Sequence, residues 1–203
     1  MKLGDVKAEA LKLMFVNLDQ DIDGENLSVF AYDETCNSYL VSMRGSIRRG
    51  LKVVANKHKL GTKTSELTEG AQGKFLTKYD LPADVLHLAR VIRKTGDSFR
   101  SVYDWRIECG KIVLPTLHRE DDGYRIVYYP KAPDLSHLED TEELEIPEEV
   151  AEMLPYYIKG ELFEEDDPGA AAQARNLFDQ WLSEQIDPEE VNAVVESVYG
   201  WQS

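Results

Sequence analysis

The chain has 203 residues, enough for one domain or two small ones, and its 42% hydrophobic and 30% charged residues are ordinary for a globular protein. No apolar run approaches the ~18 residues that a membrane span needs. The net charge of −15 is uneven, since residues 1–100 carry +3 and residues 101–203 carry −18, and such an acidic half disfavours ordinary DNA binding.

Two helices are predicted in the first third of the chain. Asp5 can cap a helix over residues 6–16, and a second helix is predicted over residues 34–61 with Gly61 at its end. The apolar stripe of the second helix is Leu40, Met43, Ile47, Leu51 and Val54. Its basic cluster is Arg44, Arg48, Arg49 and Lys52. Such a cluster is typical of a solvated or salt-bridging face, and phosphate contact is the alternative.

The segment between these helices begins like a calcium-binding EF-hand loop. Asp19, Asp21, Asp23 and Gly24 have the spacing D-x-D-x-D-G. The twelfth position of such a loop must supply a bidentate carboxylate, and here it is Phe30. We therefore interpret the segment as an acidic loop between two helices, in which Asp and Gly serve turn geometry.

The middle of the chain is predicted to form strands. Apolar and charged residues alternate along 101–110, which predicts a strand with one apolar face. That face comprises Tyr103, Trp105, Ile107 and Cys109. Further strands are expected over 111–115 and 124–130 and a short helical turn at 82–86, while residues 88–94 fit a helix and a strand equally well.

The last third is predicted to be helical again. Pro147 begins a helix that runs to residue 163, with a kink at Pro155. Asp167 and Pro168 form a cap and first-turn pair for a helix over 169–185. A capping box at 187–190 begins a short helix over 191–199.

These elements predict an α+β fold. We expect the N- and C-terminal helices to form one helical core, with a small antiparallel β-meander inserted between them. The corresponding regions are residues 1–64 (N-terminal helices), 65–135 (β-rich insertion) and 136–203 (C-terminal helices and tail).

No catalytic or cofactor constellation is found in the sequence. The stretch at 68–75 resembles a phosphate-binding P-loop, but Thr68 replaces its first glycine and Phe75 its magnesium-binding Ser or Thr. The four histidines are too scattered for a metal site. We predict a protein that is not an enzyme and has no cofactor and no metal, with Cys36 and Cys109 as free thiols.

Three stretches together resemble the head–tail connector (adaptor) proteins of tailed bacteriophages. The first is residues 3–15, LGDVKAEALKLMF; the others are an aromatic strand with proline punctuation and two helices after an acidic loop. The matching residues of the strand are Tyr128, Tyr129, Pro130 and Pro133. Those of the helices are Pro147, Leu154, Tyr157, Lys159, Gly160, Leu162, Ala171, Ala174, Arg175, Phe178 and Leu182. About half of the chain is covered, and the motifs are packing patterns rather than catalytic signatures.

The resemblance implies a structural part of the virion neck, assembled in the host cytoplasm. It implies a homo-oligomeric ring, commonly of twelve copies, that docks onto the portal protein, extends the DNA channel without specific DNA binding, and offers a platform for tail or neck proteins. In this family the C-terminal segment often reaches the portal, so Val198, Tyr199 and Trp201 are candidates for portal binding, and packing within the chain is the alternative.

Two further expectations concern charge. The acidic loop, including Asp21 and Asp23, is expected to meet the Arg44, Arg48 and Arg49 cluster of a neighbouring copy. The competing hypothesis from another functional class is an acidic binding module, a DNA mimic that occupies the basic groove of a DNA-handling enzyme. No membrane association is expected.

Overall fold

The computed structural model describes residues 1–15, 22–30, 32–67, 70–117 and 122–184, and it combines α-helices with antiparallel sheets. The described residues fall into two compact units. The helical unit comprises residues 1–60 and 132–184, and the β unit comprises residues 61–131. Each unit has its own apolar core.

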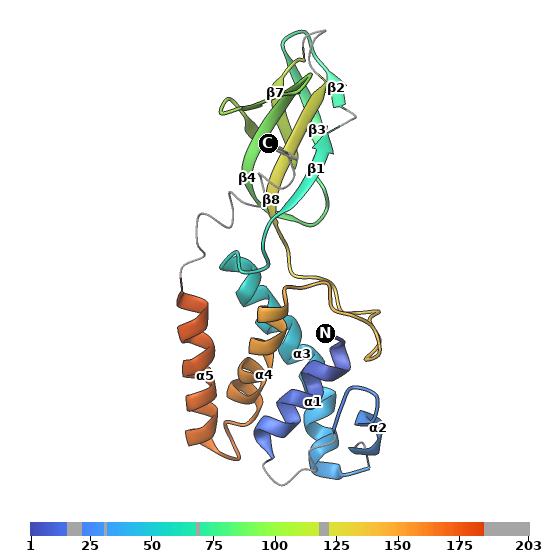
Figure 1. Cartoon of the computed structure of the whole chain (residues 1–203), viewed down its shortest axis with the longest axis vertical. Helices are drawn as coiled ribbons and strands as arrows, with labels where there is room; N and C mark the ends of the chain where they lie inside the picture. Colours follow the sequence, from blue (N-terminus) through green and yellow to red (C-terminus); the bar gives the residue numbers. More distant parts are fainter. Residues whose placement is uncertain (16–21, 31, 68–69, 118–121, 185–203) are drawn as a thin grey trace. The chain divides into compact units, whose positions relative to one another are not determined.

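The helical unit contains the helices α1 (Leu3–Met14), α2 (Leu27–Phe30), α3 (Glu34–Asn56), α4 (Glu148–Leu162) and α5 (Pro168–Ser183) (Figure 1). Local capping explains several of the boundaries. The Asp167 carboxylate accepts a hydrogen bond from the Ala170 backbone N–H at 2.9 Å and Pro168 follows it, which confirms the predicted cap and first-turn pair. Asp33 caps α3 in the same way, by accepting from the Cys36 N–H at 2.9 Å.

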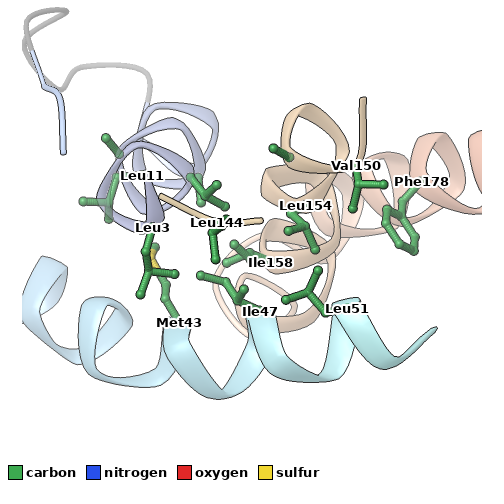
Figure 2. Packing of buried hydrophobic residues seen from close by; sticks show 14 of the residues in the cluster. Leu3, Leu11, Met43, Ile47, Leu51, Leu144, Val150, Leu154, Ile158 and Phe178 are labelled. Carbon is green, nitrogen blue, oxygen red and sulfur yellow. The ribbon is translucent and has the colours of Figure 1, made fainter. Parts of the chain in front are cut away.

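Helix α4 packs against α1, α3 and α5. Figure 2 shows Met43, Ile47 and Leu51 along one side of α3, the side that meets Leu154 and Ile158 of α4. All five side chains are buried, as is Val54, so the predicted apolar stripe of the second helix is confirmed apart from Leu40, which is half-buried. Burying each such side chain contributes roughly 1.5–3 kcal/mol to folding.

Two predicted helical features differ in detail from the structure. The second helix ends at Asn56 rather than near Gly61, and Gly61 lies beyond it with φ +74°. Asp5 lies inside the first turn of α1, where its carboxylate accepts a hydrogen bond from the Lys2 backbone N–H at 3.0 Å. Pro155 lies inside α4, as predicted, and the kink expected there stays a prediction.

The β unit consists of two four-stranded antiparallel sheets. Their strands are β1 (Lys63–Leu67), β2 (Gly70–Gln72), β3 (Leu76–Asp80), β4 (Val85–Thr95), β5 (Ser98–Ser101), β6 (Arg106–Glu108), β7 (Lys111–Pro115) and β8 (Gly123–Pro130). The orders β1-β8-β4-β5 and β2-β3-β7-β6 place strands that are distant in sequence side by side, unlike a simple meander. Residues of both sheets form one core, in which the Tyr79 and Tyr124 rings pack edge to face at 5.9 Å.

Two predictions for the middle of the chain are wrong, and a third question is settled. Residues 101–110 are not one strand, because β5 ends at Ser101 and β6 begins only at Arg106. Tyr103 is 89% exposed and Ile107 51% exposed, so they do not share a buried face with Trp105. Residues 83–84 form a turn rather than a helix, and residues 88–94 belong to the strand β4.

The break in the alternating pattern has a backbone cause at Cys109. Cys109 and Gly110 have φ of +50° and +77°, which makes a tight two-residue hairpin between β6 and β7. A cysteine rarely adopts a positive φ, so the alternating pattern of the sequence gave no sign that the strand would end there. The Cys109 side chain is exposed instead of facing the core.

Candidate functional site

Asp140 is the centre of a charged junction that ties the N-terminal helix to the segment before α4. Lys7 is only 6% exposed, and its Nζ lies 2.6 and 2.8 Å from the two carboxylate oxygens of Asp140. Arg44 adds a longer contact to Asp140 at 3.6 Å and donates a hydrogen bond to the Leu135 carbonyl at 3.1 Å. A buried lysine needs such a partner, because its charge is costly to remove from water.

The same junction contains a close approach between two glycines. A Cβ added at Gly4 would lie 2.8 Å from the Gly24 Cα and 2.8 Å from the Asp140 carbonyl oxygen. Both neighbours are backbone atoms that cannot rotate away. The Gly24 N–H also donates to the Asp5 carboxylate at 3.2 Å. Gly24, which in the sequence marks an EF-hand-like turn, therefore serves close packing against α1.

Asp23 has a local capping function in the structure. Its Oδ1 accepts hydrogen bonds from the backbone N–H groups of Glu25 and Asn26 at 2.9 and 3.0 Å, immediately before α2. The Phe30 side chain packs against the helical core, consistent with its failure to match a calcium ligand. Asp21 lies outside the described residues.

The predicted basic cluster on α3 divides into paired and unpaired cations. Arg49 donates from Nε to Glu161 of α4, and the other Glu161 oxygen accepts a hydrogen bond from the buried Ser46 hydroxyl at 2.6 Å. With Arg44 held at the Asp140 junction, two of the three arginines proposed to meet a neighbouring copy have partners within their own chain.

Arg48 and Lys52 remain exposed, and neither forms a hydrogen bond or ion pair with a residue that the structure describes. The charge of Arg48 still reaches Asp134. The pKa of Asp134 is lowered, first by hydrogen bonds from Ser136 and to a smaller extent by Arg48. These two cations are therefore the part of the cluster that is available to another molecule.

The acidic charge belongs to the helical unit. Residues 1–60 and 132–184 carry 24 Asp and Glu against 11 Lys and Arg, whereas residues 61–131 carry 10 against 12. The residues responsible lie mainly before and within the first turn of α4 and in the turn between α4 and α5. The exposed acids of residues 142–152 are Glu142, Glu143, Glu145, Glu148, Glu149 and Glu152.

The β unit balances its charges within itself. On one face of the second sheet, Glu108 accepts hydrogen bonds from Lys78 at 2.8 Å and Arg106 at 2.7 Å, and both interactions lower the Glu108 pKa. In the first sheet, burial raises the pKa of Tyr128 to about 12, and a 3.0 Å hydrogen bond to Asp84 adds to the shift. These contacts pair the named charged groups within the β unit.

The predicted C-terminal features lie outside the described residues, whereas the structure describes both cysteines. Val198, Tyr199 and Trp201, and the helix predicted over 191–199, lie outside the described residues. Both cysteines are free, as predicted: Cys36 is buried, with its pKa raised chiefly by that burial, and Cys109 is exposed.

One signal for the junction is present in the sequence of α1 itself. Lys7 lies on the apolar side of α1, in register with Leu3, Leu11 and Met14, and a lysine in that position requires an acidic partner from elsewhere. Nothing in the sequence identifies that partner as Asp140, 133 residues away.

None of the described helices has the length and apolar character needed to cross a membrane. Among the described residues, no group of His, Cys, Asp and Glu side chains is arranged to hold a metal ion. Comparison with known proteins gives no match, either to a family model or to a curated protein.

Proposed function

We propose that this protein is a structural component of a phage neck, a head–tail connector that docks onto the portal ring, extends the DNA channel and supports tail attachment. The observation that carries the proposal is that residues matching the connector pattern pack against one another in the α4–α5 pair. The proposal includes a fold in which the N- and C-terminal helices form one helical core with an inserted β region.

Gly160 is the clearest of these matching residues. A Cβ at Gly160 would lie 3.1–3.2 Å from the backbone and Cβ of Arg175, so the glycine permits close approach of the two helices. Arg175 in turn donates a hydrogen bond to the Gly160 carbonyl. The Tyr157 and Phe178 rings pack at 5.1 Å on the same helix pair. The residues of the connector pattern in α4 and α5 therefore form one packing unit, which supports the proposal.

The charge distribution is compatible with the same proposal. The helical unit carries the acidic excess, and an acidic surface beside passing DNA lowers the affinity for phosphates. The proposed assembly is a homo-oligomeric ring of about twelve copies, a number taken from the family resemblance, in contact with portal protein above and tail or neck proteins below.

Negative-stain imaging of the protein mixed with the portal ring of its own phage tests the proposal. We expect added density on one end of the ring. A second sample that lacks residues 197–203 tests the C-terminal anchor separately, and we expect it to bind more weakly. Full binding by the truncated protein would remove the anchor but leave the connector, whereas absence of density with both proteins would remove the connector.

The second candidate is a DNA mimic, and the exposed carboxylates before and within α4 favour it. It predicts salt-sensitive binding to a DNA-handling enzyme in competition with DNA, and no added density on portal rings. Its weakness is that several acids have structural partners, as Asp140, Glu161 and Asp167 do. A DNA competition assay run beside the imaging separates the two candidates.

A further inference from the structure

The outward side of α3 is cationic and unpartnered. Val41, Arg48 and Lys52 are exposed and lie at helical spacings of seven and eleven residues, which places them on one side of α3. Met43, Ile47 and Leu51, which meet α4, lie on the other side (Figure 2). Val41 is 74% exposed, an unusual degree for a β-branched apolar side chain in a helix.

The outward side of α4 is anionic. Glu148 and Glu152 are exposed, one turn apart, and neither forms a hydrogen bond or ion pair with a described residue. Two other sides of α4 are occupied, since Leu154 meets α3 and Gly160 meets α5. Lys159 lies on the same side as Glu148 and Glu152, eleven and seven residues further along, and its Nζ bonds to the Leu13 carbonyl at the end of α1. The open side of α4 is therefore the one that faces away from α3.

The helical unit consequently carries opposite charges on opposite sides, cations on the outside of α3 and carboxylates on the outside of α4. The two cations are four residues apart and so are the two carboxylates, so their spacings along the helices are equal. If α3 of one molecule lies antiparallel to α4 of another, Arg48 meets Glu152 and Lys52 meets Glu148. In the same register Val41 lies opposite Lys159, whose ammonium bonds to the Leu13 carbonyl within its own chain.

From this geometry we infer that the outer faces of α3 and α4 bind each other between two copies of the chain, head to tail. Because the two faces are different, each copy keeps one free face of each kind, and repetition gives a closed ring or an open filament. Choosing a second copy as the partner rests on the proposed function. The contact replaces the loop-to-cluster contact expected from the sequence, since Asp23, Arg44 and Arg49 are used within the chain.

Charge reversal on each face tests the inference in analytical ultracentrifugation of the isolated protein. One variant carries Arg48→Glu and Lys52→Glu, the other Glu148→Lys and Glu152→Lys. For the wild type we expect self-association that weakens between 20 and 500 mM salt, about tenfold or more. Each variant alone should associate about tenfold more weakly, because two exposed ion pairs become two repulsions. An equimolar mixture of the variants should recover the wild-type association.

A matched control separates the specific contact from net charge. Lys74→Glu with Arg90→Glu changes the net charge as the α3 variant does, but on exposed positions of the β unit, and it should associate like the wild type. Far-UV circular dichroism of each variant verifies folding, and the neutral pair Arg48→Gln with Lys52→Gln provides a milder change on the same face.

Three outcomes would overturn the inference: a wild type that stays monomeric at millimolar concentration in low salt, reversed variants that associate like the wild type, or a mixture that does not recover. The portal-imaging result is independent of these. A wild type that binds the portal but does not self-associate rejects the contact and keeps the connector. A wild type that self-associates through these two faces but does not bind the portal rejects the connector and keeps the contact.

Discussion

Replacing Gly4 by alanine should destabilise the helical unit. The new methyl carbon would lie 2.8 Å from the Gly24 Cα and 2.8 Å from the Asp140 carbonyl oxygen, both backbone atoms. Overpacking of this kind costs roughly 1–3 kcal/mol, and the helix-propensity gain of alanine over glycine offsets at most ~1 kcal/mol. The offset is smaller here, because Gly4 is the second residue of α1. We expect a net loss of about 1–2 kcal/mol in the free energy of unfolding.

Urea denaturation followed by circular dichroism at 222 nm measures the effect. With a slope of about 2 kcal/mol per molar urea, the midpoint should fall by roughly 0.5–1 M. Gly45→Ala is the matched control, because a Cβ there meets only the flexible Arg49 side chain, at 3.4 Å. That control should raise the midpoint by roughly 0.3–0.5 M through helix propensity. A Gly4→Ala midpoint equal to or above that of the wild type would refute the close-approach reasoning.

Three other outcomes can be measured on the same protein. Asp140→Ala should lower the free energy of unfolding by about 1–3 kcal/mol, because it leaves the buried Lys7 ammonium without its carboxylate; an unchanged urea midpoint would contradict this. Tyr128 should titrate near pH 12, which can be measured as the difference in 295 nm absorbance between the wild type and Tyr128→Phe. Its pKa in the folded protein lies above the unfolded value of about 10. Its contribution to stability is therefore complete below pH 10 and is lost as the pH rises through about 12. Cys109 should react with Ellman's reagent at the rate of an exposed thiol, whereas Cys36 should react only on unfolding; two equally fast thiols would contradict its burial.

The structural features that the sequence predicted correctly depend on residues that are close together in the chain. The apolar spacing of α3 and the Asp167–Pro168 cap of α5 are set within a few residues of each other, and both are found in the structure. The hairpin at Cys109 and Gly110 is also local, but its positive φ at a cysteine has no sequence signature. A regular alternation of apolar and charged residues therefore predicted too long a strand.

The junction around Asp140 depends on contacts that no local pattern encodes. Lys7 and Asp140 are 133 residues apart, and Gly4 meets Gly24 only because the chain before α4 returns to the start of α1. The sequence contains many acids before α4, and spacing alone does not distinguish the one that neutralises Lys7. Which cations of the α3 cluster remain available was equally unpredictable, because it depends on the positions of Glu161 and Asp140.

The acids of the helical unit therefore belong to two classes with different consequences. Glu161 holds Arg49 and the buried Ser46 hydroxyl, so Glu161→Gln should weaken folding, by about 1–2 kcal/mol. Glu148 and Glu152 have no partner among the described residues, so reversing their charge should change the free energy of unfolding of the dilute protein by about 1 kcal/mol at most, through the helix dipole at Glu148. The same reversal should weaken self-association at high concentration. If substitutions in both classes lowered the free energy of unfolding equally, the outward carboxylates of α4 would also serve folding. No partner molecule would then be needed to explain them.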